Sequence, residues 1–159
     1  MPTVRLSFTP AAAHVRTARL VGVAVARRAG VASELLDEVR LAIGEACSRA
    51  VALHRRHDLG DLIQVALVAG DQFTVCVTDR APIDAALGTP MPDPSVLPDP
   101  AALLDADGAA AAAETAEEEV AAGMGIALLA GLVDNLSVVP GRDGIGTEVR
   151  MSWPAGSRG

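Results

Sequence analysis

The stretch LIQVALVAGDQFTVCVTD, residues 62–79, alternates apolar and polar positions on both sides of a Gly-Asp dipeptide. The strongly apolar side chains recur at every second residue: Ile63, Val65 and Leu67, then Phe73, Val75 and Val77. A period of two is typical of strands with one buried face, and a short connection between two such runs favours an antiparallel hairpin. We therefore predict strands over residues 62–69 and 72–79, with the turn at Gly70-Asp71, as the centre of the fold.

Towards the N-terminus, the same alternation over residues 3–8 predicts a further strand. Thr9 as N-cap and Pro10 as the first helical residue then predict a helix that runs to Gly30. Ser33 is placed to cap a second, longer helix that reaches about His54. Its apolar side chains repeat at steps of three and four: Leu35, Val39, Ile43, Ala46 and Ala50.

Towards the C-terminus, residues 126–136 are apolar almost all round, which predicts a buried helix. Residues 137–139 and 145–153 predict a closing hairpin around Gly141-Arg142-Asp143-Gly144. The order is strand, helix, helix, hairpin, helix, hairpin. It predicts an α+β fold, a two-layer sandwich with a mainly antiparallel sheet and helices on one face.

Between the two hairpins lies a segment, about residues 82–120, without a regular apolar pattern. Five prolines fall between Pro90 and Pro100, and an alanine run with three consecutive glutamates follows. A connection of this length is uncommon in a compact domain, so we predict a flexible lid, with a short helix over residues 109–120. The length of 159 residues fits one domain that spans residues 1–159 and includes this lid.

Composition excludes several classes of function. All 13 basic residues are arginine, so a Walker-type phosphate loop and a lysine nucleophile are both ruled out. Aromatic residues make up 2% and the net charge is −7, which disfavours direct binding of nucleic acid. No apolar run reaches the ~20 residues of a membrane span, and the N-terminus lacks the apolar core of a signal peptide. We expect a cytoplasmic protein that does not enter membranes.

Polar residues at three places suggest chemistry. Glu45 and Arg49 lie one turn apart on the second helix, where an ordinary ion pair between them is the simplest expectation. Asp79 ends a central strand. Gly123-Met124-Gly125 precedes the buried helix, and free N–H groups at a helix start favour phosphate.

Taken together, these places resemble the GHKL (Bergerat-fold) ATPase superfamily and, within it, the small bacterial anti-sigma factors that are also serine protein kinases. The residues that carry the resemblance are Glu45-Ala46-Cys47-Ser48, Val77-Thr78-Asp79, Gly123-Met124-Gly125-Ile126, Val133-Asp134-Asn135-Leu136-Ser137-Val138 and Gly146-Thr147. They cover nearly the whole chain apart from the lid.

The resemblance implies a regulator that binds a sigma factor. It also implies that the protein phosphorylates a STAS-domain anti-anti-sigma protein with Mg-ATP, or exchanges the sigma factor for that protein as its binding partner. It also suggests a homodimer. By position the implied roles are as follows: Glu45 the general base, Asp79 the reader of the adenine amino group, Gly123 and Gly125 the backbone around the phosphates, Thr147 a hydroxyl near adenine, and Arg19 part of the partner-docking surface.

Three positions depart from the pattern of that family. Its Mg-binding asparagine falls on Arg49, which has no acceptor for a metal, so no metal ligand is expected there. A glycine of the first nucleotide-contacting box falls on Ala81, and an arginine that serves the γ-phosphate falls on Ala121. We favour a partner-binding module in which ATP binding and kinase activity are weakened or lost. The alternative is an active serine/threonine kinase in which Arg49 replaces the metal's charge and clamps phosphate.

Overall fold

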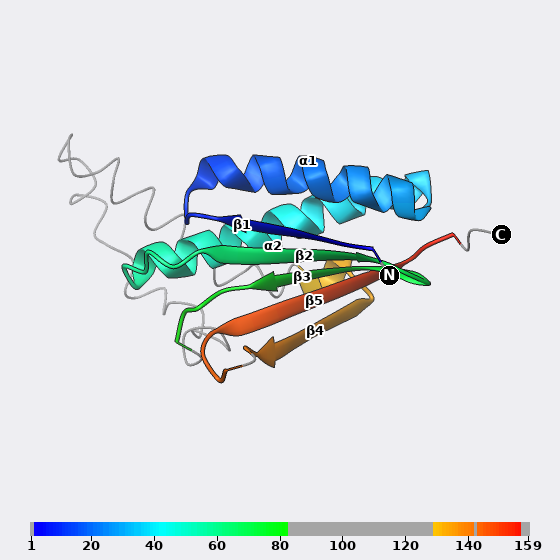
Figure 1. Ribbon diagram of the computed structural model, residues 1–159. Helices are drawn as coiled ribbons and strands as arrows, with labels where there is room; N and C mark the ends of the chain where they lie inside the picture. The colour runs from blue at the N-terminus through cyan, green and yellow to red at the C-terminus, as the bar shows by residue number, and fades with distance from the viewer. Residues whose placement is uncertain (1, 83–128, 142, 157–159) are drawn as a thin grey trace, which may run out of the picture.

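The computed structural model describes residues 2–82, 129–141 and 143–156. Its elements are β1 (Thr3–Phe8), α1 (Ala12–Ala29), the short 3₁₀ helix η1 (Ser33–Leu35), α2 (Leu36–Arg56), β2 (Ile63–Ala69), β3 (Gln72–Thr78), β4 (Asn135–Pro140) and β5 (Thr147–Pro154). The strands form a five-stranded sheet in the order β1-β2-β3-β5-β4, and every pair of neighbours is antiparallel. Helices α1 and α2 lie side by side against one face of this sheet (Figure 1), which confirms the predicted α+β fold.

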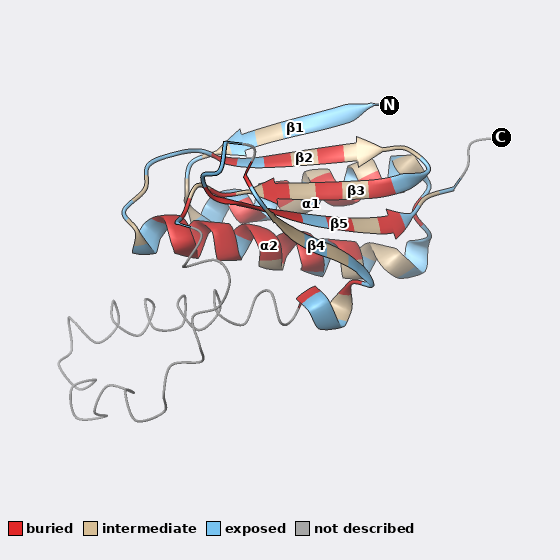
Figure 2. Cartoon of the chain, turned by 90° about the horizontal axis from the view of Figure 1, so that it is seen from below, coloured by how far each residue is buried: buried red, intermediate tan, exposed pale blue. Residues whose placement is uncertain are grey.

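The core lies between the sheet and the two helices. Alternate residues of the central strands turn to the helices and are fully buried, among them Val65, Val75 and Met151. Helix α2 meets them with the apolar stripe seen in the sequence, in which Val39, Ile43 and other side chains are buried. Viewed from below the sheet, the buried residues gather on α2 and the middle strands, whereas the edge strand β1 is largely exposed (Figure 2).

The sheet's register places the end of β3 beside the start of β5. Thr78 faces Glu148 as the last pair of the β3–β5 ladder. The next two residues continue the pairing, since the N–H of Asp79 donates to the carbonyl oxygen of Thr147 at 3.0 Å and the reverse bond is 3.3 Å. Because Val77 and Val149 point to the helices, the side chains two residues along, those of Asp79 and Thr147, share that face.

The starts of both helices differ from the prediction. Helix α1 begins at Ala12 with Ala11 as N-cap, because the N–H of Ala11 bonds to the carbonyl oxygen of Thr9 in a tight turn that includes Pro10. Ser33 begins the 3₁₀ helix η1 and makes no capping bond to α2. The predicted end of α1 is confirmed, since Gly30 adopts φ 88° and donates its N–H back to the last turn.

The predicted helix over residues 126–136 is wrong in its last part. Residues 129–132 are helical, and Leu129 and Val133 are buried in the core. Strand β4 already begins at Asn135, and Leu136 pairs with Met151 of β5, because the ladder extends further than the apolar pattern indicates. The closing hairpin is confirmed. Most of the predicted lid and its helix over residues 109–120 lie outside the described residues.

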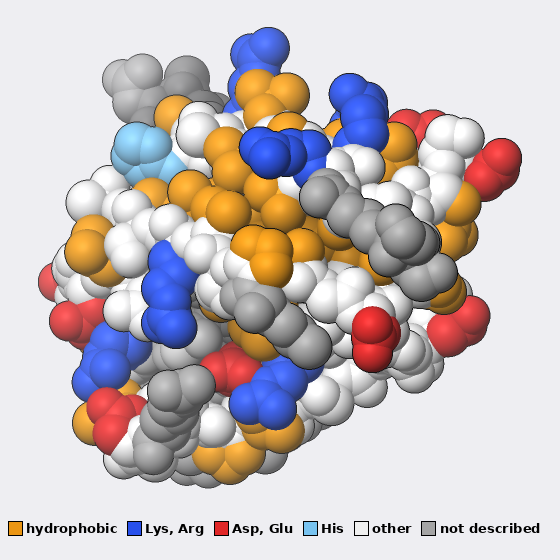
Figure 3. All heavy atoms as spheres, turned by 45° about the vertical axis from the view of Figure 1, so that its right-hand side comes forward, with side chains coloured by type: hydrophobic (Ala, Val, Ile, Leu, Met, Phe, Trp, Pro, Cys, Tyr) orange, Lys and Arg blue, Asp and Glu red, His pale blue; other side chains and the backbone are white. Residues whose placement is uncertain are grey.

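Pro2 and Gly156, the first and last described residues, lie at the same end of the molecule as the loop that joins α1 to α2 (Figure 1). A groove of about 490 Å³ opens there between α1 and β1, and its apolar walls include Val4, Val25 and Ala29. Turning this end forward shows hydrophobic side chains gathered in one area, with arginine side chains around it (Figure 3). None of the helices among the described residues is both long and apolar enough to cross a membrane.

The two cysteines differ in their surroundings, and we expect them to differ in reactivity. Burial raises the pKa of the Cys47 thiol to about 12, although the nearby Arg19 opposes this. At pH 8 only about one Cys47 in 10,000 would then be the reactive thiolate, whereas Cys76 is half-buried on the other face of the sheet. Iodoacetamide should label Cys76 in the native protein and spare Cys47, as read by peptide mass mapping.

The same labelling after unfolding in urea should modify both cysteines equally. Labelling of Cys47 in the native protein as fast as in urea would contradict its burial in the core.

Candidate functional site

The candidate site lies where α2 passes the carboxyl end of β3. Arg49 points inward from α2 and is only 3% exposed. Its Nη1 donates to Oδ2 of Asp79 at 3.2 Å, and both side chains are 2% exposed or less. Glu45 was the simplest expected partner for Arg49; the ion pair found here joins it to Asp79, 30 residues along the chain.

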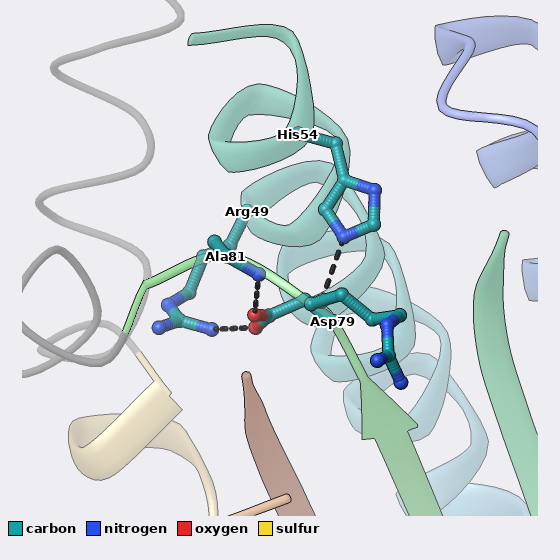
Figure 4. A network of polar contacts seen from close by, with 5 residues as sticks. Arg49, His54, Asp79 and Ala81 are labelled. Carbon is teal, nitrogen blue, oxygen red and sulfur yellow. Dashed lines mark hydrogen bonds and ion pairs between the residues drawn. The ribbon is translucent and has the colours of Figure 1, made fainter. Parts of the chain in front are cut away.

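The Asp79 carboxylate has a partner on each of its oxygens. Oδ2 accepts from Arg49, and Oδ1 accepts the backbone N–H of Ala81 at 3.0 Å. Figure 4 shows the guanidinium and the Ala81 amide both turned towards this carboxylate. The negative charge, buried to 1% exposure, is therefore neutralised and hydrogen-bonded within the protein, as a buried charge needs.

Burial lowers the pKa of the Arg49 guanidinium from its ordinary value, because an apolar environment disfavours the charged form. The charge and hydrogen bond of Asp79 act in the opposite direction. An arginine guanidinium starts from a very high pKa, and the adjacent carboxylate favours its charged form. The pair is therefore a guanidinium–carboxylate ion pair held inside the domain.

Thr147 and Gly146 close the other side of the site. Thr147 is 3% exposed and pairs through its backbone with Asp79. Gly146 has φ 74°, and a Cβ added there would overlap the carbonyl oxygen of Asp79. Only glycine combines that backbone conformation with so close an approach, which explains the glycine directly before β5.

His54 was not predicted as a site residue, yet it contacts the same segment. It is fully buried near the end of α2, and its Nε2 accepts the backbone N–H of Arg80 at 2.9 Å. The only signal in the sequence was a polar ring directly after the buried run of α2. A buried histidine needs hydrogen-bond partners, and one of them, Arg80, is 26 residues along the chain.

Arg19 and Glu45 lie in a different place, a groove of about 260 Å³ between α1 and α2. Val15, Leu41 and Ser48 also line it. Arg19 passes close over Gly44, where a Cβ would come within 2.8 Å of its Cδ. The structure therefore brings together Arg49, Asp79, Ala81 and Thr147, and it places Arg19 with Glu45 in this neighbouring groove. Gly123, Gly125 and Ala121 lie outside the described residues.

The described residues do not fit Mg-ATP in the way that the resemblance implies. Arg49, at the position of the metal-binding asparagine, has only donors and cannot ligate Mg²⁺. Asp79, at the position of the adenine reader, has both oxygens engaged by Arg49 and Ala81. Within residues 2–82, 129–141 and 143–156, no three His, Cys, Asp or Glu side chains form a group that could hold a metal ion.

Comparison with known proteins gives one family. A family model described as a histidine kinase-like ATPase domain matches residues 8–153. No curated protein matches the chain.

Proposed function

Because the chain belongs to the histidine kinase-like ATPase family, we propose that it is an anti-sigma-factor-like regulator that captures its partner without depending on nucleotide. Domains of this family generally bind ATP or ADP with Mg²⁺. The proposed partner is a sigma factor, a STAS-domain anti-anti-sigma protein, or both in turn. Binding would control transcription by keeping the sigma factor from its polymerase.

The observation that carries the proposal is the ion pair of Arg49 with Asp79. If adenine were read by Asp79, its amino group would have to reach a carboxylate that is 1% exposed and compete there with a buried guanidinium at 3.2 Å. Breaking such a pair leaves a buried charge without that partner, which costs several kcal/mol. Nucleotide binding would have to supply this free energy in addition to its usual costs, so we propose that it is weak.

The groove between α1 and α2 supports the choice of docking surface. Helix α1 has no acidic residue in 18, and the side chain of Leu20 on it is 62% exposed. Leu41 of α2 lines the groove and is 52% exposed. An apolar surface with arginines beside it suits a partner that presents apolar side chains among carboxylates. Arg19 of α1 lines the groove.

The alternative, an active serine/threonine kinase, is favoured by the position of Glu45. This carboxylate is half-buried in a groove, where a general base could be reached by a substrate hydroxyl. For phosphate transfer, Arg49 would have to leave Asp79 and clamp the phosphates. The two proposals therefore differ in whether the pair of Arg49 with Asp79 opens.

Titration of the purified protein with a candidate sigma factor or STAS protein, with and without Mg-ATP, tests the proposal. We expect the two affinities to agree within about threefold, a difference below 1 kcal/mol. Arg19→Glu should weaken the complex by about tenfold or more, because it reverses a charge that lines the groove. Arg27→Glu is the matched control, since this exposed arginine of α1 does not line the groove.

Capture that requires Mg-ATP would contradict nucleotide independence. Equal losses for Arg19→Glu and Arg27→Glu would instead indicate a general effect of charge and remove the groove from the interface.

A further inference from the structure

The ring of His54 joins three segments of the chain. His54 belongs to α2, and its Nδ1 lies 3.1 Å from the carbonyl oxygen of Asp61 in the segment before β2. Its Nε2 lies 2.9 Å from the backbone nitrogen of Arg80, which follows β3. The side chain is 0% exposed, so water does not compete for either contact.

These two partners leave one protonation state for the ring. A carbonyl oxygen only accepts, so Nδ1 must carry the proton that is donated to Asp61. A backbone N–H only donates, so Nε2 must present a lone pair to Arg80. His54 is therefore a neutral imidazole with its proton on Nδ1.

The hydrogen bond with His54 holds Arg80, which lies between Asp79 and Ala81 in the chain. Asp79 is held by its backbone to Thr147, Arg80 is held by His54, and the N–H of Ala81 turns back to Oδ1 of Asp79. Hydrogen bonds thus hold three successive residues. Of these bonds, only the one with His54 is made by a side chain of α2 (Figure 4).

Helix α2 also carries Arg49, five residues before His54. Two side chains of one helix therefore reach two successive residues, Asp79 and Arg80. The contact of His54 therefore ties Arg80, the residue next to Asp79, to the helix that carries Arg49.

We propose that His54, as the neutral imidazole protonated on Nδ1, is the positioning residue for the Asp79 carboxylate. The inference goes beyond the proposed function, because it concerns how Asp79 is held and not what the domain captures. The role of His54 requires neither nucleotide nor partner. Its test can therefore fail while the proposed function stands, and the proposed function can fail while the role of His54 stands.

Two conservative variants separate the two contacts of the ring. The amide of His54→Gln reaches the position of Nε2 and can accept from Arg80, whereas that of His54→Asn reaches only the position of Nδ1 and can donate to Asp61. In each background, a double-mutant cycle with Arg49→Met and Asp79→Asn measures the coupling of the ion pair as a ratio of unfolding equilibrium constants. A purely structural histidine would alter stability without altering this coupling.

We expect the coupling in His54→Gln to stay close to the wild-type value and that in His54→Asn to fall by about tenfold, which corresponds to 1.4 kcal/mol. His57→Gln, a half-buried histidine three residues along, should leave it unchanged. Equal coupling in all backgrounds would overturn the proposal.

The ¹⁵N spectrum of the wild-type imidazoles gives a second test that needs no variant to fold. We expect His54 to show a protonated Nδ1 and an unprotonated Nε2, with a scalar coupling across the bond to the Arg80 amide. A proton on Nε2 at neutral pH would overturn the proposal.

Discussion

Asp79→Ala lowers the free energy of unfolding by about 3–5 kcal/mol, the usual cost of removing one partner of a buried ion pair. The variant leaves the Arg49 guanidinium, at 3% exposure, facing a methyl group, and it removes the acceptor of the Ala81 N–H. Domains of this size unfold with about 5–15 kcal/mol, so a large share of the stability is lost. Urea denaturation followed by circular dichroism measures the change.

The matched control is Asp143→Ala. Asp143 also pairs with an arginine, Arg80, at 3.3 Å, but these side chains are 53% and 40% exposed. Exposed ion pairs contribute little because water and salt screen them, so this variant should lose far less stability than Asp79→Ala. Similar losses in the two variants would contradict a strong buried pair.

A double variant, Arg49→Met with Asp79→Asn, tests whether the loss of stability comes from an unpaired buried charge or from lost packing. It removes both charges and keeps an acceptor oxygen for the Ala81 N–H. Replacing a buried ion pair by uncharged side chains of similar volume is often close to neutral. We therefore expect most of the stability lost in Asp79→Ala to return.

The strands could be predicted from the sequence because their signal is local. The alternation over residues 62–79 specifies both strands of the β2–β3 hairpin to within one residue at each end. The first residues of the two helices could not be predicted from the sequence, because they depend on how the chain turns after β1 and after Gly30. Thr9 and Ser33 are good capping residues, yet backbone bonds within those turns place the first helical residue further on.

The site could be predicted only as separate positions. Asp79 was assigned by resemblance to adenine, whereas Arg49 was expected to pair with Glu45 or, in the alternative, to clamp phosphate. Their contact depends on α2 crossing the end of β3, which brings together residues 30 apart in the chain. His54 was missed for the same reason, since its contact with Arg80 depends on that crossing.

The central claim is that Asp79 is paired with Arg49 in place of nucleotide, so that nucleotide binding is weak. Calorimetric titration with ATP, with and without Mg²⁺, tests it on the wild-type protein, on Arg49→Asn and on the control Arg80→Asn. Arg49→Asn restores an oxygen ligand where the family has one and frees one oxygen of Asp79. Arg80→Asn makes the same exchange on an arginine whose side chain is 40% exposed.

We predict no measurable heat with wild type or Arg80→Asn at ATP concentrations well below 1 mM, and Mg²⁺-dependent binding by Arg49→Asn that is at least about tenfold tighter. The opposite result is tight binding of Mg-ATP by the wild-type protein with transfer of phosphate to a STAS protein. If Glu45→Ala then abolished this transfer, the protein would be a working kinase and the central claim would be wrong.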